Sequence, residues 1–347
     1  MSMTPPSSPE TQSGRAAIAA HVGGPLDAVL PGFRTAVEGM GMKLVDADGG
    51  ASVTLSRGQI LVSADGASTQ LQLLPKDRMG AQVLRDLLDT LTSRMGVPLT
   101  WDDPLPKGRP ANLSLARVVS SERISPSFQR IAVTAPDLAR FGEGGLHFTL
   151  PQGAEGQDWP FTDEGGVTRW PGGAEVWHRP VFTTREITEG PDGPVLTFDV
   201  FWHDTGRTPG WVASLVAGDE IALMGPSGSA MPKPSAYLGL IADETAVPVV
   251  ARILAQADPA VTGQAVLVVP SPEDRQEIAG PSGVQVTWLY RSEGKTPLDG
   301  LPLLALPDSD RYVLFAAEKS EAAAAKEALT ERGLVRGEFL AASYWSA

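Results

Sequence analysis

The C-terminal third of this chain takes its fold from one stretch, AYLGLIADETAVPVVARILAQ at residues 236–256. Its first apolar run predicts a buried strand, and the apolar residues after Thr245 recur at helical spacing. Asp243, Glu244 and Thr245 stand between the two elements, where dinucleotide-binding chains usually place glycines because a helix N-terminus attracts phosphate. Carboxylates there should repel phosphate, so we expect them to cap the helix, whose dipole favours acids in its first turn.

Three more apolar runs follow at residues 265–269, 284–290 and 311–317, with a second helical stretch at 320–333. This alternation of strands and helices predicts a parallel sheet covered by helices. We therefore expect a doubly wound α/β domain over residues 234–347. The end of its first strand would open into the crevice where such sheets bind ligands.

The middle of the chain has a different pattern, with short strand-like segments separated by glycine and proline. Six such segments lie at residues 111–119, 128–135, 147–151, 180–187, 195–203 and 219–225. They predict a small antiparallel β-barrel over residues 105–233. A glycine-rich insertion at 151–178 interrupts them, and we expect it to be a surface loop.

The N-terminal part predicts a small α+β domain over residues 15–104, after a disordered lead at 1–14. It combines a helix near residues 25–40, three short strands, and a second amphipathic helix that ends at Gly96. No cluster of reactive side chains marks this domain, which favours a packing or partner module. The whole chain is thus predicted to be multi-domain, with α+β, β-barrel and α/β parts.

Composition excludes several classes of protein. The 347 residues include no cysteine, which removes disulfides, thiolate metal sites and cysteine nucleophiles. The four histidines never fall at i, i+4 spacing, so a preformed metal site has little support. A net charge of −13 without a basic stripe argues against a nucleic-acid partner, and no apolar run is long enough for a membrane span. We expect a cytoplasmic protein.

Two segments of the predicted barrel carry the residue types that a flavin needs. In PVFTTREI, at residues 180–187, alternation would place Thr183 and Arg185 on one face and Phe182 on the other. An aromatic neighbour, a hydroxyl and a cation suit a flavin ring and its pyrophosphate, although an ordinary edge strand would look the same. In HDTGRTPGW, Thr208 is expected to cap a helix that would bind phosphate through free N–H groups, beside Arg207. A plain capped helix is the alternative.

From about residue 110 onward, these motifs occur in the order of a known family. VFTTR resembles its flavin motif R-x-Y-T-x-R, ADETAVPVV resembles G-D-E-T-A-L-P-A-I, and residues 218–228 fit G-D-x-[LI]-x-L-x-G-P-x-G. The chain resembles the siderophore-interacting protein family, FAD-dependent ferric-siderophore reductases of the ferredoxin-reductase-like superfamily. The N-terminal part is similar to an uncharacterised small bacterial domain. Pro180 stands where the family has its first arginine and Pro209 where it has serine, while Ala242 and Ala317 replace glycines.

The resemblance implies that electrons pass from NADPH or NADH through FAD to Fe(III), and that iron leaves the siderophore as Fe(II). Thr183 would hydrogen-bond flavin N5 as the catalytic residue. The implied cofactor-binding residues are Arg179, Phe182, Thr183, Arg185, His203, Gly206, Arg207, Thr208, Trp211, Asp243, Glu244, Thr245, Ala246, Pro248 and Trp345. Tyr344 is a further candidate for covering the flavin or nicotinamide face, and the candidate cations for an anionic ferric siderophore are Arg291, Lys295 and Lys319.

Two alternatives to this function stay open. The first is a flavoprotein of the same fold that uses another acceptor, or ferredoxin as donor. The second is a flavin-free member that binds iron complexes or a partner without catalysis. We expect a monomer or a weak homo-oligomer.

Overall fold

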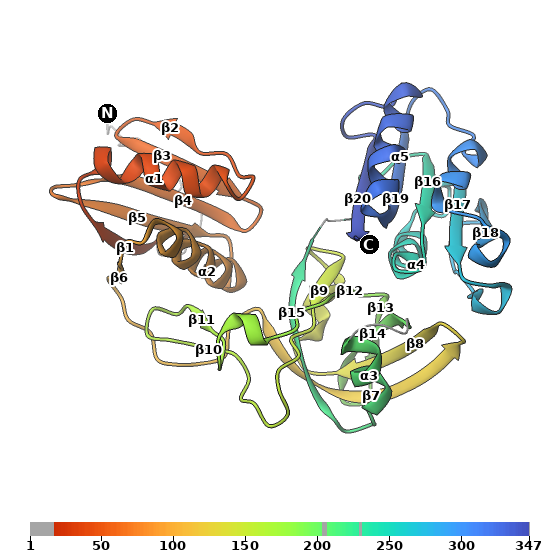
Figure 1. Cartoon of the computed structure of the whole chain (residues 1–347), viewed down its shortest axis with the longest axis horizontal. Helices are drawn as coiled ribbons and strands as arrows, with labels where there is room; N and C mark the ends of the chain where they lie inside the picture. Colours follow the sequence, from red (N-terminus) through yellow and green to blue (C-terminus); the bar gives the residue numbers. More distant parts are fainter. Residues whose placement is uncertain (1–16, 203–206, 229–230, 347) are drawn as a thin grey trace, which may run out of the picture. The chain divides into compact units, whose positions relative to one another are not determined.

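The computed structural model describes residues 17–202, 207–228 and 231–346. The chain forms two compact units, Met1–Leu113 with Gly153–Trp177, and Ser114–Gln152 with His178–Ala347. Each unit is described below by itself (Figure 1). No helix in the described part of the chain has the length and apolarity needed to cross a bilayer.

The first unit contains a six-stranded antiparallel sheet with two helices. Its elements are β1 Ile18–Gly23, α1 Leu26–Glu38, β2 Val45–Ala47, β3 Gly50–Leu55, β4 Gly58–Asp65, β5 Ser68–Pro75, α2 Arg78–Met95 and β6 Leu99–Trp101. The strand order is β2-β3-β4-β5-β1-β6. Alternate residues of the strands are buried together with the apolar faces of both helices, as the sequence pattern requires.

Both predicted helices and the three predicted strands of this unit are confirmed, whereas β1, β2 and β6 were not predicted. Gly96 ends α2 in the left-handed conformation, with φ of 68°, which glycine adopts without strain. At the other end, Asp77 accepts a hydrogen bond from the Gly80 N–H and caps the helix.

The glycine-rich insertion, expected to be a surface loop, has many exposed residues and also packs on α2. Its short strands, β10 Phe161–Thr162 and β11 Thr168–Arg169, pair with each other. The Thr168 N–H and hydroxyl donate to the Asp86 carboxylate at 2.8 Å each, and Arg169 donates to both oxygens of Asp89 at 3.0 and 3.1 Å. Gln82, one turn before Asp86, donates to the Gly166 carbonyl at 3.0 Å. The insertion therefore provides hydrogen-bond partners for the polar side chains on one face of α2.

The second unit begins with a seven-stranded antiparallel sheet. Its elements are β7 Leu113–Ser125, β8 Phe128–Thr134, β9 His147–Thr149, β12 Val181–Thr183, β13 Glu186–Gly190, β14 Gly193–Phe201, α3 Arg207–Ser214 and β15 Glu220–Ser227. The strand order is β12-β9-β15-β7-β8-β14-β13. Since the two outermost strands, β12 and β13, are consecutive in the chain, the sheet must curl on itself, which confirms the barrel-like architecture.

Residues 180–187 form two strands, not the single strand that was predicted. The Thr184 N–H donates to the Leu146 carbonyl at 3.0 Å, but the Arg185 N–H donates to the Thr197 carbonyl at 2.8 Å. The chain thus changes partner between these residues, from β9 to β14. Strict alternation fails at this step, and so does the expectation that Thr183 and Arg185 share one face.

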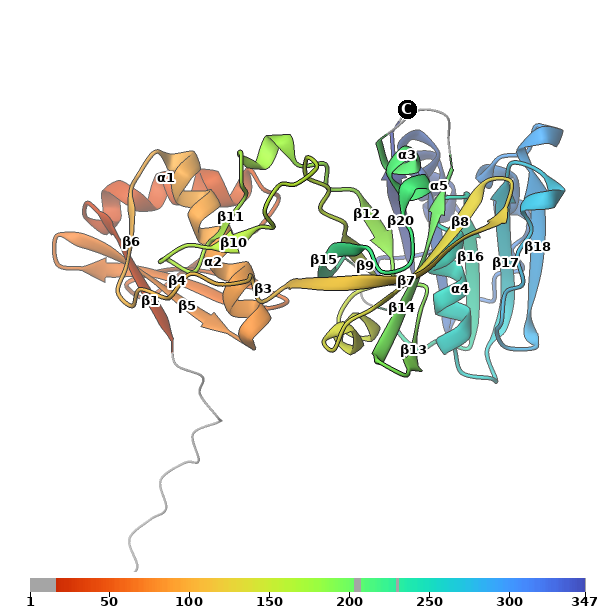
Figure 2. The ribbon, with the colours of Figure 1, turned by 90° about the horizontal axis from the view of Figure 1, so that it is seen from below.

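The rest of the second unit is the predicted parallel sheet. Its elements are β16 Tyr237–Ala242, α4 Val247–Gln256, β17 Thr262–Val269, β18 Gly283–Tyr290, β19 Arg311–Glu318, α5 Lys319–Glu331 and β20 Phe339–Trp345. The order is β18-β17-β16-β19-β20, with every pair parallel (Figures 1 and 2). Helices α4 and α5 pack on opposite faces. Ala242 and Ala317 are fully buried in these two cores, so their methyl groups fill packing space.

Two buried charged side chains join the barrel to the parallel sheet. Arg252 of α4, which is 2% exposed, donates to the carbonyls of Leu146, Thr184, Phe141 and Gly142 at 2.9–3.3 Å. Asp274, after β17, accepts from the Ser125 hydroxyl and from the N–H and hydroxyl of Ser127 at 2.8–3.0 Å. These contacts hold both parts in one compact unit.

Candidate functional site

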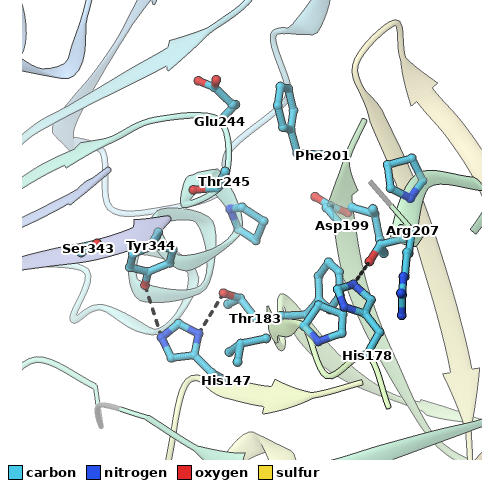
Figure 3. A pocket seen from close by; sticks show the side chains of 17 residues that line it. His147, His178, Thr183, Asp199, Phe201, Arg207, Glu244, Thr245, Ser343 and Tyr344 are labelled. Atoms are coloured by element: carbon cyan, nitrogen blue, oxygen red, sulfur yellow. Dashed lines mark hydrogen bonds between the residues drawn. The ribbon is translucent and has the colours of Figure 1, made fainter. Parts of the chain in front are cut away.

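A cavity of about 530 Å³ lies within the second unit, where the barrel meets the carboxyl ends of β16 and β20 (Figure 3). Its size falls within the usual range for ligand pockets. Of the residues proposed from sequence, eight line it: Phe182, Thr183, Arg207, Thr208, Glu244, Thr245, Pro248 and Tyr344. The other lining residues are His147, His178, Pro180, Val181, Asp199, Val200, Phe201, Pro209 and Ser343.

The barrel wall of the cavity presents Phe182 and Thr183 from β12. Phe182 packs against the rings of Phe148 and Phe198, with centroids 6.3 and 5.5 Å away, so the barrel core fixes its position. Thr183 is 5% exposed, and its hydroxyl lies 3.1 Å from Nδ1 of His147 on the neighbouring strand β9. The predicted aromatic ring of Phe182 and the predicted hydroxyl of Thr183 therefore line the same cavity.

His147 continues a hydrogen-bonded chain across the cavity wall. Its Nε2 lies 3.3 Å from the Tyr344 hydroxyl of β20, and the two rings meet edge to face (Figure 3). Burial, and then the charge of Arg252, lower the pKa of His147, so its ring is neutral near pH 7. Burial raises the pKa of Tyr344, which keeps the phenol protonated. In one tautomer of His147 the Thr183 hydroxyl is free to donate into the cavity, and in the other its oxygen can accept.

The start of α3 forms a second part of the wall. The described part of this helix runs from Arg207, so Thr208 lies within the helix and not at the predicted N-cap. The Thr208 hydroxyl lies 3.1 Å from Nε2 of His178, and Arg207 stands beside this pair (Figure 3). Burial, and then the nearby Arg207, lower the pKa of His178. Trp211 packs against the barrel core and does not line the cavity. The proposed residues His203 and Gly206 lie outside the described part of the chain.

Arg185 is not available as the free phosphate-binding cation that the sequence suggested. Its guanidinium donates at 2.8 Å to Asp199, whose side chain is fully buried. Arg130 donates to both oxygens of the same carboxylate, at 2.7 and 3.0 Å. A buried carboxylate requires such partners, because an unpaired charge in the interior is costly. Arg179 is exposed and does not line the cavity either.

The Asp243–Thr245 junction is closed by its own hydrogen bonds. Asp243, fully buried, accepts from the Thr245 N–H at 2.9 Å, from the Thr245 hydroxyl at 2.6 Å, and from Nε1 of Trp345 at 2.7 Å. It closes a turn just before α4, whose N-cap residue is Ala246, without a side-chain cap. The expected capping of α4 by the side chains of Asp243 and Glu244 is therefore not seen. Ala246 is buried in the core, and neither it nor Trp345 lines the cavity.

The proposed siderophore cations do not line this cavity. Arg291, directly after β18, donates through Nε to both oxygens of Glu244 at 3.0 and 3.1 Å, so its charge is already paired. Glu244 is 6% exposed, and burial raises its pKa even though Arg291 acts in the opposite direction. Lys295 and Lys319 are exposed and lie outside the lining.

Sequence reasoning missed His147, His178 and Asp199. An aspartate inside the apolar strand VLTFDVFWH was the available signal, because a buried carboxylate demands a cation. Arg130 lies opposite it on β8, and Arg185 lies just before β13. The two histidines gave no such signal. Their significance depends on Thr183 and Thr208, which are 36 and 30 residues away in the chain.

Comparisons with known proteins identify the family of the second unit. Residues 117–230 match the model of the siderophore-interacting FAD-binding domain, and residues 235–347 match that of the siderophore-interacting protein. Ferric vibriobactin reductase ViuB of Vibrio cholerae is 27% identical over 243 residues, covering 65% of this chain and 87% of that protein. The NADPH-dependent ferric-chelate reductase of Escherichia coli is 29% identical over 211 residues, covering 58% and 80%.

An uncharacterised protein of Mycobacterium tuberculosis is 36% identical over 98 residues, and the match spans 28% of this chain but only 35% of the relative. Among solved structures, a siderophore utilization protein from T. fusca has a TM-score of 0.59 at 26% identity, covering 70% of this chain and 95% of that one. Together, two adjoining family matches and the fold shared with that structure establish that the chain belongs to the siderophore-interacting protein family, with residues 117–230 as its FAD-binding domain.

Proposed function

We propose that this protein is a flavin-dependent reductase that takes electrons from NAD(P)H and delivers them through FAD to the Fe(III) of a ferric siderophore. One observation carries the proposal. The flavin-motif residues Phe182 and Thr183 share a cavity with Thr245 and Pro248, at the carboxyl end of the first parallel strand. A donor bound at the sheet and a flavin bound at the barrel would therefore meet in one place.

The residues of the cavity fit FAD. Phe182 offers an aromatic surface, the buried Thr183 offers a hydroxyl held by His147, and Arg207 offers positive charge at the start of α3. FAD would supply the redox chemistry itself, accepting a hydride and releasing electrons singly, while the protein contributes binding and orientation. The two tautomers of His147 allow Thr183 to present either a donor or an acceptor to the polar edge of a flavin.

The proposed position of the nicotinamide donor follows from the topology of the parallel sheet. The strand order reverses between β16 and β19, and ligands of doubly wound sheets bind outside the carboxyl ends at such a point. Thr245, held by Asp243, and Pro248, at the start of α4, shape this edge. The NADPH dependence named for the Escherichia coli relative supports a nicotinamide donor.

The acceptor is proposed from the chemistry that the relatives' names describe. Siderophores bind iron through hard oxygen ligands that favour Fe(III), so reduction to Fe(II) weakens the complex and releases the metal. Exposed Lys295 and Lys319 remain the candidate cations for an anionic complex. We further propose that the protein works in the cytoplasm as a monomer or a weak homo-oligomer.

An anaerobic two-step assay tests this function. The protein is loaded with FAD, and the visible flavin band is followed first on addition of NADPH or NADH, then on addition of a ferric siderophore with an Fe(II) chelator present. We expect bleaching, followed by recovery of the band together with Fe(II) formation. Bleaching without recovery would indicate another acceptor, and reduction by ferredoxin alone would indicate another donor. A protein that never retains FAD would overturn the proposal in favour of a flavin-free binding role.

A further inference from the structure

The cavity wall beside α3 lacks the arginine pair that the family motif would supply for the FAD pyrophosphate. Position 180 is proline, and Arg185 together with Arg130 is paired with the buried Asp199. Arg179 is exposed and lies outside the lining. Each phosphate of FAD nevertheless carries a negative charge, which needs a cation or several N–H donors in a partly buried site.

Among the described lining residues, the side chains that can carry positive charge are Arg207, His178 and His147. His147 is engaged at both ring nitrogens, by Thr183 and Tyr344. His178 instead stands beside Arg207 and contacts Thr208 in the first turn of α3 (Figure 3). The N–H groups of that turn and the helix dipole favour an anion at the same point, although Pro209 contributes no N–H.

We propose that His178, in its protonated form, binds the FAD pyrophosphate together with Arg207 and the start of α3, so that this protein holds FAD more tightly as the pH falls. This inference rests on FAD as the cofactor of the proposed function. It names a residue that the arginine-based motif does not include, and it gives the cofactor site a pH dependence that an arginine could not give.

The contact with Thr208 adds a second effect of the same proton. A neutral His178 can accept at Nε2 from the Thr208 hydroxyl, 3.1 Å away, and the hydroxyl hydrogen is then unavailable to a phosphate. When Nε2 is protonated it must donate to the Thr208 oxygen, which leaves the hydroxyl hydrogen free to donate elsewhere. Protonation therefore brings one positive charge and one additional hydrogen-bond donor to the same part of the wall.

The backbone around His178 keeps the ring in place. Its N–H and carbonyl exchange hydrogen bonds with Gln152 at 3.0 and 2.8 Å, just before the strand β12. The charged groups facing it among the described residues are Arg207 on α3 and, farther along the cavity, Asp199 on β14, which is neutralised by its two arginines. Its own segment contributes the exposed Arg179.

The direction of the pH effect follows from linkage. Without FAD, burial and Arg207 lower the pKa of His178, so the ring is mostly neutral at pH 7. A bound pyrophosphate favours the charged ring and raises its pKa in the complex. The extra affinity is then fully present below the pKa of the free protein and is lost as the pH rises through the pKa of the complex. Between the two values, the dissociation constant should rise about tenfold for each pH unit.

Titration of flavin-free full-length protein with FAD, followed by quenching of flavin fluorescence between about pH 5 and 8, tests the inference. The wild type should bind more weakly as the pH rises. His178→Gln keeps a partner for Thr208 but cannot be charged, so it should bind with a nearly flat profile near the weak, high-pH affinity. His178→Arg should also give a flat profile, and its affinity for FAD should be equal to or higher than that of the wild type at low pH. His21→Gln, on β1 of the first unit, is the matched control and should follow the wild type.

The outcomes are distinguishable. A pH-independent wild type, or a slope that persists in His178→Gln, would overturn the inference, and a slope that instead disappears in His147→Gln would move the role to that residue. If neither the wild type nor any variant binds FAD at any pH, while all proteins unfold at the same temperature, both this inference and the proposed FAD-dependent function fail. Normal FAD binding without pH dependence refutes only the role of His178.

Discussion

Arg252 offers the sharpest test of how the site is held together. The guanidinium is buried on α4 and donates to four carbonyls of the barrel. Two of these carbonyls belong to Leu146 and Thr184, the immediate neighbours of His147 and Thr183. One side chain thus anchors both segments that carry the cavity hydrogen bonds, and its removal should affect stability and FAD binding together.

The expected cost of Arg252→Met can be worked from these contacts. Each hydrogen bond contributes about 1 kcal/mol net, and somewhat more when the donor is charged. Four lost bonds would cost about 4–6 kcal/mol, although the Leu146 carbonyl would keep the Thr184 N–H as a partner. Removing a buried charge returns part of its desolvation penalty, so we expect a net loss of about 3 kcal/mol.

Because the chain has two compact units, a single unfolding transition cannot be assumed, and the assay must be local. Native-state hydrogen exchange read by mass spectrometry separates the second unit from the first. Arg252→Met should lower the protection of α4 and of residues 146–149 and 183–184, while the six-stranded sheet keeps its protection. Arg336→Met, at an exposed position of the same unit, is the control.

The reasoning would be refuted by a variant whose second unit opens with a free energy within about 0.5 kcal/mol of the control, the usual range for surface substitutions. A large loss of stability spread equally over both units would also contradict it, because the contacts lie within the second unit alone. FAD affinity should fall in parallel with the loss of protection around residues 146–149. Unchanged affinity would mean that the two segments are held by other contacts.

Three further substitutions test single contacts of the site. Thr183→Val should leave FAD bound but slow its anaerobic reduction by NADPH about 100-fold, as when a positioned donor is lost, while the neighbouring Thr184→Val, outside the cavity, should match the wild type in stopped-flow traces. Asp199→Asn leaves the largely buried Arg185 and the partly exposed Arg130 without their counter-charge and should lower the stability of the second unit by about 3 kcal/mol in native-state hydrogen exchange; a loss below about 1 kcal/mol would contradict its role. Trp345→Phe removes the donor to buried Asp243 and should lower the stability of the second unit by about 1–3 kcal/mol in native-state hydrogen exchange, whereas unchanged protection would show that the bond contributes nothing.

Local patterns carried most of the fold prediction. Continuous apolar runs identified β16 to β19, and alternation with turn residues identified most barrel strands, because burial on one or two faces leaves a direct trace in the sequence. The partner change at residues 184–185 left no such trace. This change of partner depends on which strand pairs with which around the barrel, and the pairing is determined by the whole sheet and not by the local sequence.

The sequence also could not show which charged residues are paired in the folded protein. Arg185 and Arg291 are cations next to expected phosphate or substrate positions, yet each is paired with an acid far away in the chain or on another strand. Sequence spacing identifies which residue types are present but not which charges remain unpaired after folding. The insertion is a similar case, since its fit to Asp86 and Asp89 of α2 appears only when segments about 80 residues apart meet.

The two carboxylates of the Asp243–Glu244–Thr245 junction can now be assigned to physical roles. Asp243 accepts hydrogen bonds from Thr245 and Trp345, and Glu244 is paired with Arg291. Neither carboxylate therefore faces the cavity as a free negative charge. Pro248, near the first position of α4, has no N–H to offer a phosphate, and this helix start is buried. The junction is therefore a rigid edge of the crevice and not a phosphate site. We therefore propose that phosphate binds on the barrel side of the same cavity, where α3 lies beside His178.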